Sequence, residues 1–263
     1  DTGRNGGAGI GGSVATTNLT ISVSGGTITA RGGKSGAGIG GGHKSKDVSI
    51  SVTGGNIIAV GGNYGAGIGA GDGDIGDSQN VTISISGGRI EADGGINAAG
   101  IGSGDYASCG AITISGGTVN VTADTGAKQI GNGRDGYGKA SSVTITGGAV
   151  YPALAQVSPA PTNSASKAVF PVDFEIGEAT NKVTSLTLSG ALASYSYGTT
   201  DLYTDASGNL RVWLPATDGA GFVAKVVMES GEEYFFSFVS TYSVSGRGSA
   251  LPGAHVRERG ELH

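Results

Sequence analysis

The sequence predicts an all-β protein: a parallel β-helix of about five coils, each with three strands, followed by a small antiparallel β-sandwich-like domain. Gly-Ile-Gly occurs four times and a fifth, degenerate copy reads Gln129-Ile130-Gly131; the five isoleucines are separated by 29, 29, 33 and 29 residues. Each copy precedes a segment in which apolar and hydroxyl residues alternate, and then a Gly-Gly pair. A strand-built repeat of this length is typical of stacked coils, in which equivalent residues of successive coils become neighbours.

The coil at residues 34–62 shows why each element is expected. Its first strand is Gly36–Gly40, and a loop through His43 follows. Residues 48–53 alternate strictly between apolar and hydroxyl side chains, which is typical of a half-buried strand. Gly54-Gly55 is predicted to turn the corner, since glycine readily adopts positive φ. Residues 56–60 then form the third strand.

Stacking these coils predicts three inward columns of aliphatic residues. Each column takes one residue from every coil, about one strand spacing from the next. The columns are Ile10/Ile39/Ile68/Ile101/Ile130, Ile21/Ile50/Ile83/Ile112/Val143 and Ile28/Ile57/Ile90/Val119/Val150.

The repeat ends near residue 156, so residues 1–156 are assigned to the solenoid. Residues 157–166 are rich in Pro, Ser and Ala and are predicted to form a linker. Residues 167–245 contain strand patterns separated by Gly-containing turns, and they include Trp213, from which we expect a separate core. This second domain could also cap the open end of the solenoid. Residues 246–263 have no strand pattern and are treated as a tail.

Composition excludes several classes of function. The 263 residues carry a net charge of −5 with scattered basic residues, which argues against a nucleic-acid partner. The sequence contains no run of 18 apolar residues, so membrane insertion is not predicted. Cys109 is the only cysteine, so a disulfide framework and a Cys-based zinc site are excluded. The glycine-rich, Ser/Thr-rich composition favours an exported bacterial protein, located outside the cell or on its surface.

A polar column four residues after each repeat isoleucine is the first candidate site. It contains Val14, His43, Asp72, Asp105 and Arg134. Asp72 and Asp105, one coil apart, could act as acid and base. Repulsion between two nearby carboxylates raises the pKa of one of them, which leaves a protonated acid beside an ionised base. Alternatively they could bind Ca²⁺ together with Asp74 and Asp77. The simpler interpretation is that these are solvated turn residues.

The second candidate is the Gly-Ile-Gly face. Its outward positions are glycines, which would allow a ligand or another part of the chain to approach the backbone closely. Tyr64, Tyr106 and Tyr137 border this strand and could stack on sugar rings. Tight packing is the structural alternative for these glycines. The outer face of the third strand, which includes Arg89 and Glu91, shows no regular ladder and is interpreted as ordinary solvated surface.

GAGIGGG at 36–42 followed by VSISVTGGNIIAVGG at 48–62 resembles repeats of large cell-surface proteins of Gram-positive bacteria. Residues 203–215 are similar to a module that often follows such repeats. The repeats are also similar to pectate-lyase-like carbohydrate-binding β-helices. These resemblances imply an extracellular location and glycan binding.

Three function classes follow. The leading one is a secreted or cell-surface glycan-binding or adhesive module that uses the Gly-Ile-Gly face, with His43, Tyr64, Asp72, Asp105, Tyr106, Arg134 and Tyr137 as contacts and with Ca²⁺ as a possible cofactor. The alternative is a polysaccharide-degrading glycoside hydrolase or lyase that uses Asp72 and Asp105. The third is a structural stalk.

Overall fold

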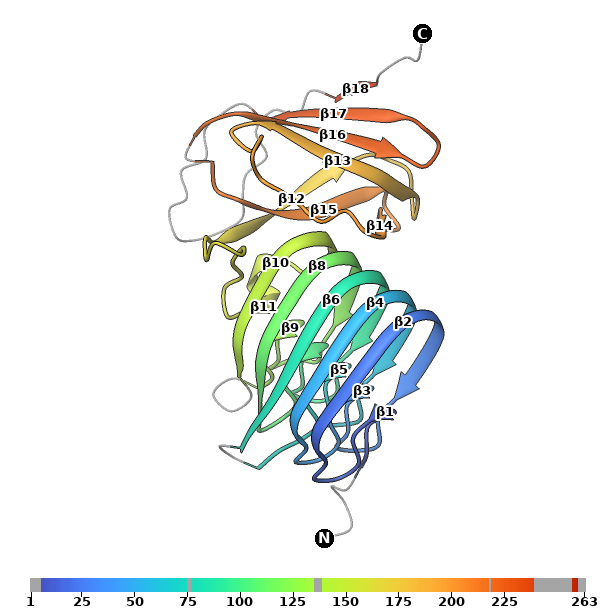
Figure 1. Ribbon diagram of the computed structural model, residues 1–263, viewed down its shortest axis with the longest axis vertical. Helices are drawn as coiled ribbons and strands as arrows, with labels where there is room; N and C mark the ends of the chain where they lie inside the picture. Colours follow the sequence, from blue (N-terminus) through green and yellow to red (C-terminus); the bar gives the residue numbers. More distant parts are fainter. Residues whose placement is uncertain (1–5, 75–76, 135–138, 218, 239–256, 260–263) are drawn as a thin grey trace.

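The computed structural model describes residues 6–74, 77–134, 139–217, 219–238 and 257–259; at 77–78 and 257–259 it describes the backbone alone. The N-terminal part is a solenoid of stacked coils, and a smaller β module lies on its C-terminal end (Figure 1). The chain is therefore all-β, as the repeat predicts.

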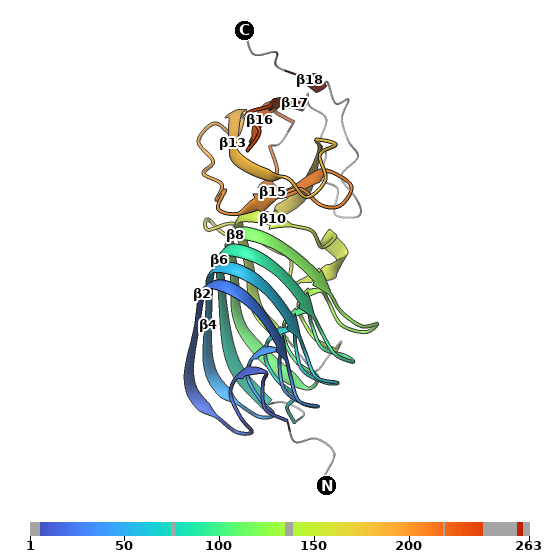
Figure 2. The same ribbon diagram turned by 90° about the vertical axis from the view of Figure 1, so that its right-hand side faces the viewer.

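Two parallel sheets form the solenoid (Figures 1 and 2). The short strands β1, β3, β5, β7, β9 and β11 form one sheet, at Ile10–Gly11, Ile39–Gly40, Ile68–Gly69, Ile101–Gly102, Ile130–Gly131 and Val157–Ser158. The long strands β2, β4, β6, β8 and β10 form the other, at Thr17–Arg31, Lys46–Val60, Asp77–Asp93, Ala107–Thr122 and Ala140–Val150.

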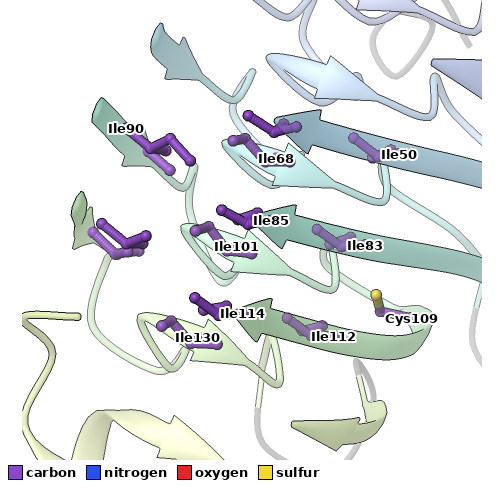
Figure 3. Packing of buried hydrophobic residues seen from close by; sticks show 14 of the residues in the cluster. Ile50, Ile68, Ile83, Ile85, Ile90, Ile101, Cys109, Ile112, Ile114 and Ile130 are labelled. Carbon is purple, nitrogen blue, oxygen red and sulfur yellow. The ribbon is translucent and has the colours of Figure 1, made fainter. Parts of the chain in front are cut away.

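The three predicted columns are confirmed by the strand register. Ile39 pairs with Ile68 and Ile68 with Ile101 in the short-strand sheet, and the two columns of the long strands pair in the same way. Figure 3 shows several of these isoleucines in successive layers of a single core. Ile39, Ile68 and Ile101 are completely buried, so the coils share a continuous apolar interior.

The second and third strands of each coil are joined into one bent strand. In β4 the ladder continues from residues 48–53 to 56–60, with register shifts between Val52 and Asn56. Gly55 has a φ of 103°, which allows the backbone to turn without leaving the sheet. Each coil therefore consists of one short strand and one long bent strand.

Residues 157–158, within the predicted linker, form β11. Val157 pairs with Ile130 and Ser158 with Gly131, which extends the short-strand sheet by one strand beyond β9, the strand of the fifth repeat. A 3₁₀ helix at Leu154–Gln156 leads into it. The solenoid pattern thus continues past the last recognisable repeat.

The C-terminal module consists of two antiparallel sheets that enclose an aromatic core. One pairs β12 (Val169–Glu175) with β15 (Asn209–Pro215). The other has the order β14–β13–β16–β17–β18, at Leu202–Tyr203, Lys182–Gly190, Phe222–Met228, Glu233–Phe238 and Arg257–Arg259. Between them Phe174 contacts Phe236, with ring centroids 5.0 Å apart. β18 lies in the part of the chain predicted to be a tail, and its backbone pairs with β17.

The module has a core of its own, as expected, but Trp213 does not belong to it, so the assignment of Trp213 to that core is wrong. Along β15 the side chains alternate: Leu210, Val212 and Leu214 pack inside the module, whereas Trp213 packs into the core of the solenoid. Its indole N–H donates to the carbonyl of Val150 over 2.8 Å, and the residue is completely buried. The module therefore caps the C-terminal end of the solenoid, as expected.

No helix among the described residues is long and apolar enough to cross a membrane.

Candidate functional site

The polar column lies in the loops that join the short strands to the long ones. The amides of Ala15, Lys44 and Gly73 donate to the carbonyls of His43, Asp72 and Asp105, respectively, over 2.8–3.0 Å. These loops are thus stacked one coil apart, and the predicted column exists in the backbone. The side chains point away from solvent, however: His43 is 7% exposed, Asp72 1% and Asp105 3%.

Asp72 belongs to a polar layer inside these loops. The Ser35 hydroxyl donates to its carboxylate over 3.2 Å, and the Gln79 side-chain amide donates to its backbone carbonyl over 2.8 Å. Ser35 and Gln79 are themselves completely buried. The Ser35 bond joins successive coils and the Gln79 bond closes the loop of Asp72 on itself, so catalysis by Asp72 and Asp105 on a polysaccharide would require the loops to open.

The predicted calcium ligands are not gathered into a cage. The carboxylate of Asp74 lies 2.6 Å from the ammonium of Lys44 and is largely exposed, unlike that of Asp72. The side chain of Asp77 lies outside the described residues. Within the described part of the chain, no three His, Cys, Asp or Glu side chains converge on a common point. Calcium binding at this column stays a prediction.

The bordering tyrosines have separate surroundings. The Arg134 guanidinium donates to the Tyr106 hydroxyl over 2.8 Å and lies 5.6 Å from the centre of its ring. Tyr64 is half-buried. Tyr137 lies outside the described residues. Arg134 and Tyr106 are therefore neighbours, and a ligand role for the three tyrosines stays a prediction.

From the second coil onward the Gly-Ile-Gly face is not a free surface, so the expectation that this face is open to a ligand is wrong; the first copy, at residues 9–11, is exposed at the end of the solenoid. Residues 36–42 are buried. A Cβ atom on Gly38 would lie 2.6 Å from the Gly67 carbonyl oxygen and 2.7 Å from the Val60 amide nitrogen. The end of the long strand and the neighbouring coil already occupy this space. Tight packing is thus the reason for the repeated glycines.

The structure instead places a groove on the outer face of the long strands, at the segments after the Gly-Gly corners. Strand pairing aligns two outward rows there: Ile58, Glu91 and Asn120, and next to them Val60, Asp93 and Thr122. With Gln129, Tyr151 and Pro152, these rows line a cavity of about 460 Å³, here called the outer groove. Glu91, Asp93 and Asn120 are exposed on its floor.

Tyr151 forms the wall of the outer groove where the solenoid meets the module. Its hydroxyl donates to the carbonyl oxygens of Tyr203 and Asn209, which lie 2.6 and 3.0 Å away. Burial, reinforced by the nearby carboxylates of Asp205 and Asp173, raises the pKa of this hydroxyl, so it stays a protonated donor. Anchored in this way, the ring is held in a fixed position beside the polar floor.

The outer groove is not among the sites expected from sequence, because its floor and the residues that hold its wall come from distant segments of the chain. The outward residues of the third segments follow no regular pattern, and the Tyr151 ring is positioned by carbonyls more than 50 residues further along the chain. The charged pair Glu91 and Asp93, on one face of one strand, is the available signal. By itself this pair is indistinguishable from ordinary solvated surface.

Comparison with known proteins supports the fold and goes no further. A family model described as a β-helix repeat matches residues 21–43 and 83–105. Both segments run from the long strand of one coil to the loop after the next Gly-Ile-Gly. No curated protein and no solved structure gives a significant match to the chain.

Proposed function

We propose that the chain is a secreted or cell-surface module that binds a glycan in the outer groove without cleaving it. The observation that carries the proposal is the fixed ring of Tyr151 beside a floor of carboxylate, amide and hydroxyl groups. The extracellular location rests on the low charge, the Ser/Thr-rich composition and the resemblance to surface-protein repeats. A β-helix repeat fold is consistent with carbohydrate-binding, adhesive and enzymatic roles.

Sugars need this combination of groups. The C–H face of a pyranose stacks on an aromatic ring, and its hydroxyls require donors and acceptors placed around it. Glu91 and Asp93 can accept hydrogen bonds from sugar hydroxyls, and Asn120 can both donate and accept. Ile58, which is 41% exposed, adds an apolar contact on the same floor. A structural stalk has no need of such a groove.

Polysaccharide binding can be tested by affinity electrophoresis and on a glycan array with the full chain. Glu91→Ala and Asn120→Ala each remove a polar group from the floor and should weaken binding about tenfold, as expected for one lost hydrogen bond to a charged or amide partner. Ser84→Ala is the matched control, because Ser84 is an exposed residue of β6, the strand of Glu91, and lines no part of the groove. Absence of glycan binding, or equal binding by all three variants, would remove the proposal.

Hydrolysis is the second candidate, and it is favoured by the pair of carboxylates. Glu91 and Asp93 are two residues apart on one strand face, so their Cα atoms lie about 6.6 Å apart. Inverting glycosidases hold their two carboxyl groups about 6.5–9.5 Å apart, a separation that side chains on Cα atoms at this spacing can reach. Release of reducing ends by the wild type, lost in Glu91→Gln, would support an enzyme. Binding without release would favour the non-catalytic module.

A further inference from the structure

A second pocket lies on the same outer face, at the Gly-Gly corners. It has a volume of about 360 Å³ and is called the corner pocket. Its lining residues are Gly25, Gly26, Thr27, Gly55, Asn56, Gly88, Arg89, Asp201 and Tyr203. Asn56 and Arg89 pair across the sheet and precede the residues of the outer groove by two positions on each strand. The two pockets are therefore adjacent.

A row of backbone amides runs along the Gly-Gly corners. The second glycine of each Gly-Gly pair has a similar positive φ, between 85° and 103°, at Gly26, Gly55, Gly88, Gly117 and Gly148. In the last three coils these amides donate out of the solenoid to the module: Gly88 to the Asp201 carboxylate, Gly117 to the Thr200 carbonyl and Gly148 to the Gly198 carbonyl, over 2.7–2.9 Å. Gly26 and Gly55 share this conformation and line the corner pocket.

The module completes the pocket with an aromatic ring and a carboxylate. The Arg89 guanidinium lies 4.5 Å above the centre of the Tyr203 ring, and the Tyr203 amide donates to the Thr118 hydroxyl over 2.8 Å, which fixes this segment of the module against the solenoid. Corner glycines, an asparagine, an arginine, a carboxylate and a tyrosine thus converge from two parts of the chain. This set offers both donors and acceptors to a ligand rich in hydroxyl groups.

We propose that the corner pocket is a second sugar subsite and that the glycan bound across both pockets is uncharged. The inference rests on the proposed glycan-binding function and adds the site and the ligand class. Three carboxylates line the two pockets, at Glu91, Asp93 and Asp201, against one cation, Arg89. An anionic polymer would meet a net negative surface, whereas hydroxyl groups can bond to every one of these residues.

The ligand class can be tested with pairs of polymers that share one backbone. The probes are hydroxyethyl cellulose against carboxymethyl cellulose, dextran against dextran sulfate, and methyl-esterified against de-esterified pectin. At about 0.1 M salt, exposed charges still interact over roughly 10 Å. In at least one pair, the uncharged polymer should bind at least about ten times more tightly than its charged counterpart. Equal or tighter binding of the charged members would overturn the inference.

The role of the three carboxylates is tested by neutralising them. The variant Glu91→Gln, Asp93→Asn, Asp201→Asn keeps hydrogen-bonding side chains at every position, and the new side-chain amide at position 201 would retain an oxygen to accept the hydrogen bond from the Gly88 amide. It should reduce the preference for the uncharged polymer at least about threefold. Glu229→Gln is the control, since Glu229 is exposed and lines neither pocket. An unchanged preference in the triple variant would contradict the electrostatic explanation.

The subsite itself is tested by Asn56→Ala, which removes an exposed amide of the corner pocket and should weaken binding of the uncharged polymer about fivefold. If Glu91→Ala weakens binding and Asn56→Ala does not, the outer groove binds alone; the proposed function then stands and the second subsite falls. If no polymer binds the wild type, the proposed function itself is wrong. Unfolding curves of each variant, compared with wild type, separate loss of binding from loss of fold.

Discussion

The solenoid and the C-terminal module are both β structures, but they build their cores in different ways. In the solenoid each coil adds an equivalent layer, and Ile39, Ile68 and Ile101 occupy equivalent positions with equal burial. In the module each core residue has its own position and contacts, with no equivalent elsewhere in the described part of the module. Phe222, for example, stacks on Phe238 with ring centroids 4.4 Å apart, a pair that has no repeat elsewhere among the described residues.

The comparison shows how a repeating structure is brought to an end. Every inner coil is covered by a neighbour on both sides, whereas a terminal coil has one side uncovered. At the C-terminal end the module covers this side with Trp213, which is completely buried. At the first coil Ile10 remains 36% exposed, although its equivalents in the next four coils are completely buried. The non-repeating module therefore supplies what another coil would have supplied.

Trp213→Ala should produce the largest loss of stability. Removal of a buried tryptophan lowers the free energy of unfolding by about 3–5 kcal/mol. Because this side chain belongs to the solenoid core, we expect the last coils and the module to be destabilised together, as measured by urea unfolding with far-UV and near-UV circular dichroism. Phe236→Ala, within the module's own core, is the comparison. A solenoid transition that is unaffected by Trp213→Ala would show that the module does not act as a cap.

Ile68→Ala and Ile10→Ala compare an inner coil with the first one. Ile68 is completely buried, so truncation should lower the free energy of unfolding by about 3 kcal/mol. The same truncation at Ile10, which is 36% exposed, should lower it by about 1 kcal/mol, because less apolar surface is lost from the interior. Equal losses in denaturant titrations would mean that the first coil is covered as completely as the inner ones.

Gly38→Ala and Gly25→Ala compare two glycines of the repeat. A Cβ on Gly38 would lie 2.6 Å from a backbone oxygen of the next coil, whereas one on Gly25 would meet nothing within 4 Å. Forcing the coils apart should lower the free energy of unfolding by about 2 kcal/mol for Gly38→Ala. Gly25→Ala should leave it within about 0.5 kcal/mol of wild type. Similar melting temperatures for the two variants would contradict the packing explanation.

The solenoid could be predicted in detail because each column is made of residues at equivalent positions of a local pattern that repeats in every coil. The alternation in 48–53 and the corner at Gly54-Gly55 are visible within one coil, and five copies identify the partners of every residue. The burial of the Gly-Ile-Gly face and of Asp72 could not be predicted in this way. It depends on how the loops and the end of each long strand fold back across the coil, and spacing alone does not reveal that direction.

The outer groove could not be predicted from the sequence for a different reason. Its floor comes from the solenoid, but the position of the Tyr151 ring depends on the module, whose strands have no internal repeat to identify their partners. Trp213 illustrates the same difficulty. Its placement on one face of β15 follows from alternation, yet which face meets the solenoid is decided by tertiary packing. Contacts between unlike domains leave no periodic signal in a single sequence.

Cys109 gives the smallest expected effect and tests the solenoid interior by pH. Its thiol is buried and donates to the Val81 carbonyl over 2.8 Å, and burial raises its pKa from 9.0 to about 12. The unfolded chain therefore releases this proton first as the pH rises. The stabilising contribution is complete below pH 9 and is lost between pH 9 and 12.

Urea unfolding at about pH 7 and about pH 9.5 of wild type and Cys109→Ala measures this contribution. Between the two pH values wild type should lose about 1 kcal/mol more than the variant. The buried tyrosines are common to both proteins, so their titration cancels in the difference. Iodoacetamide at the higher pH should modify the wild-type thiol only as fast as the protein unfolds, because the reactive thiolate is suppressed in the core. Rapid modification of the folded protein, or identical pH dependence of the two stabilities, would place Cys109 outside the sealed interior of the solenoid.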